Sequence, residues 1–229
     1  MKLEEIIKDL IYGELSAHGM CKSGDILEKD RPRVVAHINT VLTDLYTRFP
    51  LLTKELILVQ DSSITAYHLH NKHAISNTAS TDPEKYILDT PAEPFMNDVL
   101  RVDAVYDELG DNLLLNSDSA CKVALTPAQD VLEIPNPTDT NNLFVIYRAN
   151  HPRVELLTDE LVLPEQFRST LLAGVASRVY SGGTAADHMN ISNNLFQKYE
   201  LLCSQVELFG MVNKHDTILN KKPCLGGWV

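Results

Sequence analysis

The sequence lacks the motifs of the common enzyme classes. It contains no G-x-S-x-G turn and no phosphate loop, and the pair Gly182-Gly183 follows helical sequence, which is typical of a turn between helices. Its four cysteines are scattered, with no C-x-x-C pair, so we expect reduced thiols in a reducing compartment. These absences predict a protein that is not an enzyme and carries no cofactor.

Long apolar runs and an excess of positive charge are also missing. No stretch approaches the ~18 consecutive apolar residues of a membrane helix, and the N-terminus alternates charged and apolar residues, unlike a signal peptide. The net charge is −11, which argues against a protein that wraps nucleic acid tightly. A like-charged surface would instead let DNA pass close by without sticking. We therefore expect no membrane partner.

Apolar periodicity predicts four helices, over residues 3–17, 32–49, 164–181 and 185–209. Residues 55–163 contain short β-type runs, broken by Pro, Asn and Asp. The candidate strands are residues 56–59, 64–69, 86–88, 99–106, 113–115, 131–134 and 143–147. The expected fold class is α+β: a bundle of four main helices (residues 1–54 and 164–213), with a β-rich domain (55–163) inserted between helices 2 and 3. An extended C-terminal arm (214–229) would follow.

The β-rich segment carries most of the negative charge. Residues 55–160 include 18 acidic and 6 basic residues. Asp103, Asp107, Glu108 and Asp111 surround a predicted hairpin loop and could pair for hydrolysis or metal binding, but the full calcium-loop pattern is missing. A solvated acidic turn is the preferred interpretation.

A second candidate site is the H-x-H-x₂-H cluster of His68, His70 and His73. Alternate histidines on a strand share one face and could bind a metal ion. However, no neighbouring carboxylate completes a familiar site, so solvated loop histidines are the preferred interpretation and no metal is expected.

Arginine beside aromatic residues is a recurring feature of the chain. Arg48, Arg148, Arg153 and Arg178 each follow or interrupt an apolar run, in the segments LYTRF, VIYRA, HPRV and ASRVY. Such arginines are typical of interface anchors and of pairs with carboxylates, although they can also snorkel from a helix or strand edge. We predict that these four arginines make contacts at an interface or between elements.

The C-terminal residues 214–229 follow no helical or strand period. They contain the only tryptophan, Trp228, and three lysines against one aspartate. A large aromatic side chain in such a segment is either part of a frayed terminus or an anchor for another subunit. The candidate anchor residues share apolar or basic character: Ile218, Leu219, Lys221, Lys222, Leu225 and Trp228.

Three sequence blocks resemble the head-to-tail adaptor (connector) proteins of short-tailed double-stranded DNA bacteriophages. The first runs from Ile38-Asn39 to Leu45-Tyr46-Thr47-Arg48-Phe49 and is similar to the second helix of that family. The second is Val145-Ile146-Tyr147-Arg148-Ala149-Asn150-His151-Pro152, which closes the β insert in the family. The third, Leu163-Pro164 followed by Ala176-Ser177-Arg178-Val179-Tyr180, is similar to its third helix.

The resemblance implies a virion structural protein at the head-tail junction, assembled in the host cytoplasm. It also implies contacts between subunits or between elements by the five residues that match the family pattern: Arg48, Tyr147, Arg148, Arg178 and Tyr180. Such adaptors form a dodecameric ring beneath the portal, continue the DNA channel and provide the platform for a tail tube or nozzle protein. The C-terminal arm would then bind the portal protein through the six anchor residues, with double-stranded DNA only passing nearby. The alternatives are a tail-completion or head-closure (stopper) protein and, as a third hypothesis, a metal-binding enzyme domain.

Overall fold

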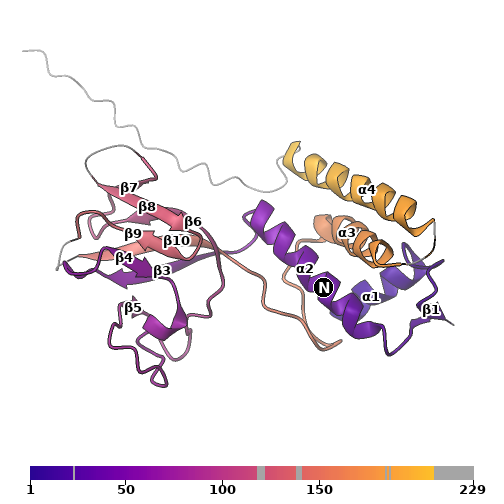
Figure 1. Cartoon of the computed structure of the whole chain (residues 1–229), viewed down its shortest axis with the longest axis horizontal. Coiled ribbons are helices and arrows are strands. Elements are labelled where there is room, and N and C mark those ends of the chain that lie inside the picture. The colour runs from indigo at the N-terminus through magenta and orange to yellow at the C-terminus, as the bar shows by residue number, and fades with distance from the viewer. Residues whose placement is uncertain (23, 118–121, 138–140, 184, 186, 209–229) are drawn as a thin grey trace, which may run out of the picture.

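The computed structural model describes residues 1–208 apart from 23, 118–121, 138–140, 184 and 186. The chain forms two lobes that lie end to end (Figure 1). The helical lobe contains both ends of the described chain, and the sheet lobe contains its middle. The predicted arm, residues 214–229, falls outside the described residues.

Helix α1 (Leu3–Tyr12) is shorter than the sequence predicts. Five apolar residues on one face are buried, which explains the periodicity: Leu3, Ile6, Ile7, Leu10 and Ile11. The helix ends at Gly13, where a Cβ atom would lie 2.8 Å from the carbonyl oxygen of Asp9. The glycine thus permits a backbone turn that any side chain would obstruct. A small hairpin of β1 (Cys21–Lys22) and β2 (Asp25–Ile26) follows.

Helix α2 (Arg31–Arg48) begins with Pro32 in its first turn, where a missing N–H costs nothing. Its apolar face is buried from Val34 to Tyr46. The backbone becomes extended at Phe49, before Pro50, because the residue before proline disfavours the helical conformation. The predicted helix at 32–49 therefore matches α2 to within one residue at each end.

The sheet lobe is built on one eight-stranded sheet in the order β4-β9-β8-β7-β6-β10-β3-β5. Its strands are β3 (Thr53–Val59), β4 (Ala66–His68), β5 (Ile87–Leu88), β6 (Val99–Tyr106), β7 (Asn112–Leu115), β8 (Val123–Ala128), β9 (Val131–Glu133) and β10 (Asn142–Ala149). The central strand β10 pairs antiparallel with both β3 and β6. Burial alternates along β10, so one face of this strand packs into the lobe's core.

Strand β8 was not predicted from the sequence. It contains Pro127, which cannot donate to a ladder and argues against a strand. The structure accommodates this residue at an irregularity in the pairing with β9, between Leu125 and Ala128. β8 also pairs with β7 in parallel, which is the one parallel pairing among the named strands.

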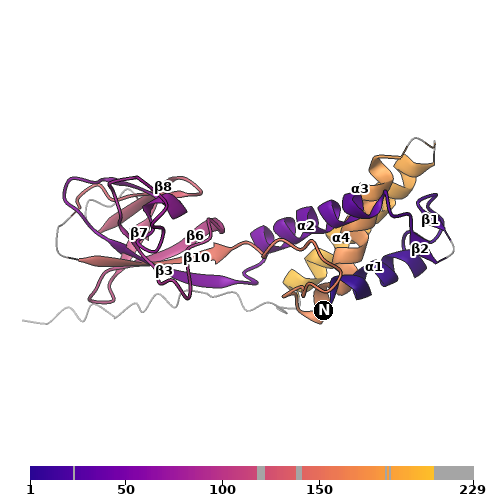
Figure 2. The same cartoon turned by 90° about the horizontal axis from the view of Figure 1, so that it is seen from below.

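Two helices complete the helical lobe, after the short 3₁₀ turn η2 (Glu165–Phe167). Helix α3 (Arg168–Ser181) is buried on several sides and packs against α1, α2 and α4. Helix α4 (His188–Leu208) lies along α3 on the outside of the lobe (Figures 1 and 2). Small residues on α3, such as Ala173, Gly174 and Ala176, are buried and let these neighbours approach closely.

The predicted fold class is wrong. The structure is a mixed α/β fold whose largest feature is the eight-stranded sheet, and it is not a four-helix bundle with an added insertion. The helices surround α3 rather than forming a closed ring of four. An apolar stripe locates a helix but does not identify the neighbour that the stripe faces. Nor do short β-type runs indicate how many of them join into one sheet.

Each lobe has its own hydrophobic core. The core of the helical lobe also takes in Val154, Leu161 and Leu163, from the connection between β10 and α3. Leu52, between α2 and β3, packs against both cores. The chain crosses between the lobes twice, and the two crossings are joined where the Ala149 N–H donates to the Leu52 carbonyl at 2.9 Å. The domain boundaries given above stay a prediction.

Candidate functional site

Arg148 joins the sheet lobe to the helical lobe. Its Nε donates to Oδ2 of Asp103, on the neighbouring strand β6, at 3.0 Å. Its Nη1 donates to the backbone carbonyl oxygens of Thr47 at 3.1 Å and Arg48 at 3.4 Å. These carbonyls belong to the last turn of α2, where no helical N–H remains to satisfy them. One guanidinium group therefore fastens a helix end to the sheet.

Tyr147 makes a second contact at this end of the sheet. Its hydroxyl donates to Oδ1 of Asp98 at 3.1 Å, and Lys54 on β3 pairs with the same carboxylate at 2.5 Å. Burial, together with the negative charge of Asp98, raises the pKa of the Tyr147 hydroxyl. Asp98 thus connects β10, β3 and the start of β6.

Arg48 links the ends of α2 and α4. Its Nη1 lies 2.9 Å from Oε2 of Glu200, and its Nε lies 2.9 Å from Oε1 of Glu207. Seven residues separate the two glutamates, so they share one face of α4. The hydrogen bond to Glu207, followed by the one to Glu200, raises the pKa of Arg48 against the opposing effect of burial.

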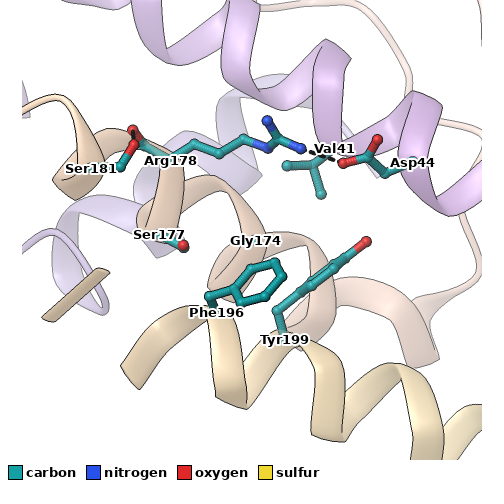
Figure 3. Close-up of a pocket in the computed structure, with 8 residues that line it drawn as sticks. All are labelled: Val41, Asp44, Gly174, Ser177, Arg178, Ser181, Phe196 and Tyr199. Atoms are coloured by element: carbon teal, nitrogen blue, oxygen red, sulfur yellow. Dashed lines mark hydrogen bonds and ion pairs between the residues drawn. The ribbon is translucent and has the colours of Figure 1, made fainter. Parts of the chain in front are cut away.

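Arg178 spans a groove between α2, α3 and α4, which we call the α2/α3/α4 groove (Figure 3). Its guanidinium reaches from α3 to the carboxylate of Asp44 on α2. Phe196 and Tyr199 of α4 form the other wall, with ring centroids 6.2 Å apart. The groove holds about 180 Å³ and is lined by Val41, Asp44, Gly174, Ser177, Arg178, Ser181, Phe196 and Tyr199.

Tyr180 contacts two histidines at the far end of the helical lobe. Its ring packs edge-on against His18 and against His188, with centroids 4.9 Å and 5.1 Å away. The two imidazole rings lie 5.0 Å from each other. Burial, then the charges of His188 and Arg33, lower the pKa of His18. Tyr180 therefore joins α3, α4 and the loop after α1.

The three clustered histidines do not converge on one metal site. His70 pairs with Asp130 at 3.1 Å, whereas the buried His73 ring stacks on Tyr86 and its Nδ1 contacts the Glu84 carbonyl oxygen at 2.9 Å. Within the described part of the chain, the set able to hold a metal is His73 with Asp82 and Glu84. Sequence spacing missed the two acids, because they follow His73 only after a polar loop.

The acidic loop is organised by hydrogen bonds and a lysine. Oδ1 of Asp107 accepts from the backbone N–H groups of Leu109 and Asp111. Lys122 pairs with Asp107 at 3.0 Å and also with Asp111. Asp103 is occupied by Arg148, and Glu108 accepts from the Asn142 N–H at 2.7 Å. These carboxylates are therefore engaged within the fold.

The structure gives the predicted arginines and tyrosines partners that sequence reasoning missed: Asp44, Asp98, Asp103, Glu200 and Glu207. Three of these pairings join residues more than a hundred positions apart, which no local pattern can indicate. Whether the five predicted residues also contact a second subunit stays a prediction. The six anchor residues of the arm, from Ile218 to Trp228, lie outside the described residues.

No profile of a known protein family matches the chain, and no curated protein is significantly similar to it. Among the helices that the structure describes, none is long and apolar enough to cross a membrane.

Proposed function

We propose that the chain is a virion structural protein, a head-to-tail adaptor that forms a dodecameric ring between the portal and the tail of a short-tailed bacteriophage. In this role it continues the DNA channel and offers a platform to a tail tube or nozzle protein. The C-terminal arm binds the portal through Leu219, Leu225 and Trp228, with Lys221 and Lys222 as charge partners.

One observation carries the proposal: the three sequence blocks that resemble the adaptor family meet in space. Arg148 of the second block bonds to the carbonyls of Thr47 and Arg48 in the first. Arg178 of the third block pairs with Asp44, which lies within the first. The three blocks lie far apart in the sequence, and these bonds join them into one connected network.

The charge distribution also supports a part that lies beside DNA without gripping it. The chain carries −11, and residues 55–160 hold most of the acidic excess. If part of this charge faces the channel of a twelve-copy ring, DNA meets a repulsive wall, which favours sliding over binding. In addition, the carboxylates of the acidic loop bond to a lysine and to backbone N–H groups, as befits a structural element.

Attachment to the portal tests the proposal. Purified chain is mixed with portal rings of the phage that encodes it, and the complex is examined by sedimentation and electron microscopy. We expect a twelve-fold ring on the portal. Deletion of Asn220–Val229 should abolish attachment and leave the circular dichroism spectrum unchanged.

Two results would contradict the proposal. If the full chain fails to bind the portal, the adaptor role is wrong. If the truncated chain binds as well as the full chain, the arm is not the portal contact. Imaging the position of the protein in the virion separates an adaptor, which contacts the portal, from a stopper or tail-completion protein, which has different neighbours.

A further inference from the structure

We propose that two surfaces of the helical lobe, on opposite sides of α2, bind each other between neighbouring copies of this chain. One surface is the turn of residues 155–162, and the other is the α2/α3/α4 groove. This inference rests on the proposed ring, because it identifies the contact by which one subunit holds the next.

The 155–162 turn exposes two apolar side chains on a fixed backbone. Leu156 is 65% exposed and Val162 is 59% exposed. Oδ2 of Asp159 accepts from the N–H groups of Glu155 and Leu156, at 2.7 Å and 2.9 Å. A backbone held in this way loses little conformational freedom when its exposed apolar side chains bind a partner.

The chain's first residues fix the same turn from the other side. The Leu3 N–H donates to the Asp159 carbonyl at 3.0 Å, and the Leu161 N–H donates to the Met1 carbonyl at 2.7 Å. Val162 is held too, since its N–H donates to Nε2 of His151 at 3.0 Å and its carbonyl accepts from the Tyr46 hydroxyl. The turn is therefore built into the core of the lobe while its apolar tips face outward.

The groove has a size and lining that suit such a tip. It holds about 180 Å³, and a cavity of roughly 150 Å³ is enough for a benzene ring. Gly174 forms its floor, because a Cβ there would lie 2.9 Å from Val41 and 3.0 Å from Tyr199. Phe196, at 53% exposure, is the accessible apolar wall (Figure 3).

The charges of the turn and the groove favour docking of one on the other. Glu155, Asp159 and Glu160 in the turn outnumber the neighbouring Arg153, which lies 3.3 Å from Glu155, so the turn is acidic. Arg178 is the cationic group that lines the groove, where it pairs with Asp44. Docking can therefore set the acids of the turn against Arg178. Copies of a chain with a charge of −11 repel each other over most of their surface, so contact is favoured where an acidic surface meets a cation.

The two surfaces point away from each other, as a head-to-tail contact requires. Asn39 of α2 bonds to Val154 next to the turn, whereas Val41 lines the groove. These positions are about 160° apart around a helix axis. In Figure 1, α4 runs along one side of the helical lobe, and the connection from β10 to α3 runs along the other. Two different patches on opposite sides give a contact that repeats from copy to copy and closes into a ring if the rotation fits.

A capping experiment tests this contact. Leu156→Asp places a charge on the turn and keeps the groove intact. Phe196→Asp places a charge in the groove and keeps the turn intact. We expect the wild-type chain to form assemblies larger than dimers by sedimentation velocity, and each variant alone to associate at least about thirtyfold more weakly. An equimolar mixture of the two variants should form dimers and stop there, because only one intact turn-groove pair is available.

Matched controls are Leu109→Asp and Leu208→Asp, at side chains that are 86% and 82% exposed and belong to neither surface. They should associate as the wild type does. Circular dichroism and melting temperature show whether each variant is folded. As a second measurement, Arg178→Glu and Glu155→Arg should each weaken association, and the double variant should restore it.

Three results would overturn the contact. The wild-type chain stays monomeric, the mixture of the two variants fails to form dimers or forms assemblies larger than dimers, or the control variants weaken association as much as Leu156→Asp and Phe196→Asp do. The outcome is separable from that of the proposed function. Portal binding together with unaffected self-association in Leu156→Asp would keep the adaptor role and reject the contact. Capped dimers without portal binding would keep the contact and reject the adaptor role.

Discussion

Arg148 on β10 donates from Nη1 to the backbone carbonyl of Thr47, the residue before the last in α2, at 3.1 Å. This bond joins the sheet lobe to the helical lobe. A side chain from the sheet thus completes the end of a helix whose last carbonyls would otherwise rely on water.

We expect Arg148→Ala to lower the free energy of unfolding by about 2–3 kcal/mol, because it removes charge-assisted hydrogen bonds to Asp103 and to the carbonyls of α2. The Arg148 side chain is 17% exposed, so water cannot fully replace the hydrogen bonds that it makes. Arg148→Lys should recover only part of the loss, since an ammonium group cannot reach both elements in the same way. Urea denaturation measures both, and a loss below about 0.5 kcal/mol for Arg148→Ala would contradict the lobe-joining role.

Gly174→Ala should destabilise the helical lobe by about 1–3 kcal/mol, because the added methyl group meets Val41 and Tyr199 at 3.0 Å or less. The matched control is Gly19→Ala, where a Cβ meets nothing within 4 Å. We expect the control to leave the melting temperature unchanged or slightly raised. Equal effects of the two substitutions would show that the groove floor can relax.

Arg48→Ala removes two ion pairs on partly exposed groups, so we expect a loss of only about 1 kcal/mol. Because solvent ions screen such pairs, the difference from the wild type should shrink at 1 M salt. Arg101→Ala serves as the control, since Arg101 is 68% exposed and makes one pair at 3.3 Å. Denaturation at low and high salt measures this difference. If the loss of unfolding free energy is the same at both salt concentrations, it comes from packing of the arginine's aliphatic stem and not from its ion pairs.

Acid should weaken the fold through His151. Burial lowers the pKa of this side chain, and its Nε2 accepts from the Val162 N–H at 3.0 Å, so protonation would remove the acceptor. A pKa that is lower in the folded chain than in the unfolded one gives stability above the unfolded value of about 6.5, and that stability is lost as the pH falls through the folded value. His151→Gln should therefore show a smaller change in unfolding free energy between pH 7.5 and 5.5. A parallel pH dependence in wild type and variant would refute this.

Zinc should not stabilise the protein through the histidine cluster. His73, Asp82 and Glu84 lie close enough to share an ion, but Nδ1 of His73 is already bonded to the Glu84 carbonyl. We expect the wild-type chain to have the same melting temperature with zinc and with chelator. The His73→Asn variant should likewise melt at the same temperature in both conditions. A rise in melting temperature with zinc that the substitution abolishes would establish a metal site.

The sequence predicted the local elements better than their assembly. The predicted bounds of helix α2 are correct to within one residue at each end. Its apolar stripe and the prolines near both ends are local signals, which can be read from a few neighbouring residues. Strand β8 was missed, since Pro127 argues against a strand and only the irregular pairing with β9 explains its presence. The fold class was wrong for a similar reason: joining eight strands into one sheet depends on partners distant in the chain.

The candidate site was also only partly predictable from the sequence. Arginine beside aromatic residues directed attention to Arg48, Arg148 and Arg178, since such residues stand out within apolar runs. The carboxylates that pair with these arginines could not be predicted, because nothing in the sequence around each acid distinguishes it from other acids on polar faces. The groove around Gly174 forms where three helices pack together, and the spacing of residues along one helix cannot predict it.

The paired crossings between the lobes have a mechanical consequence. Adjacent strands β3 and β10 remain hydrogen-bonded up to the junction, where Ala149 donates to Leu52. A single crossing would act as a swivel, whereas two bonded crossings behave as a flat strap that bends across its width and resists torsion. Torque applied to one lobe therefore reaches the other, and load from one end of the molecule passes to the opposite end through a joint two strands wide.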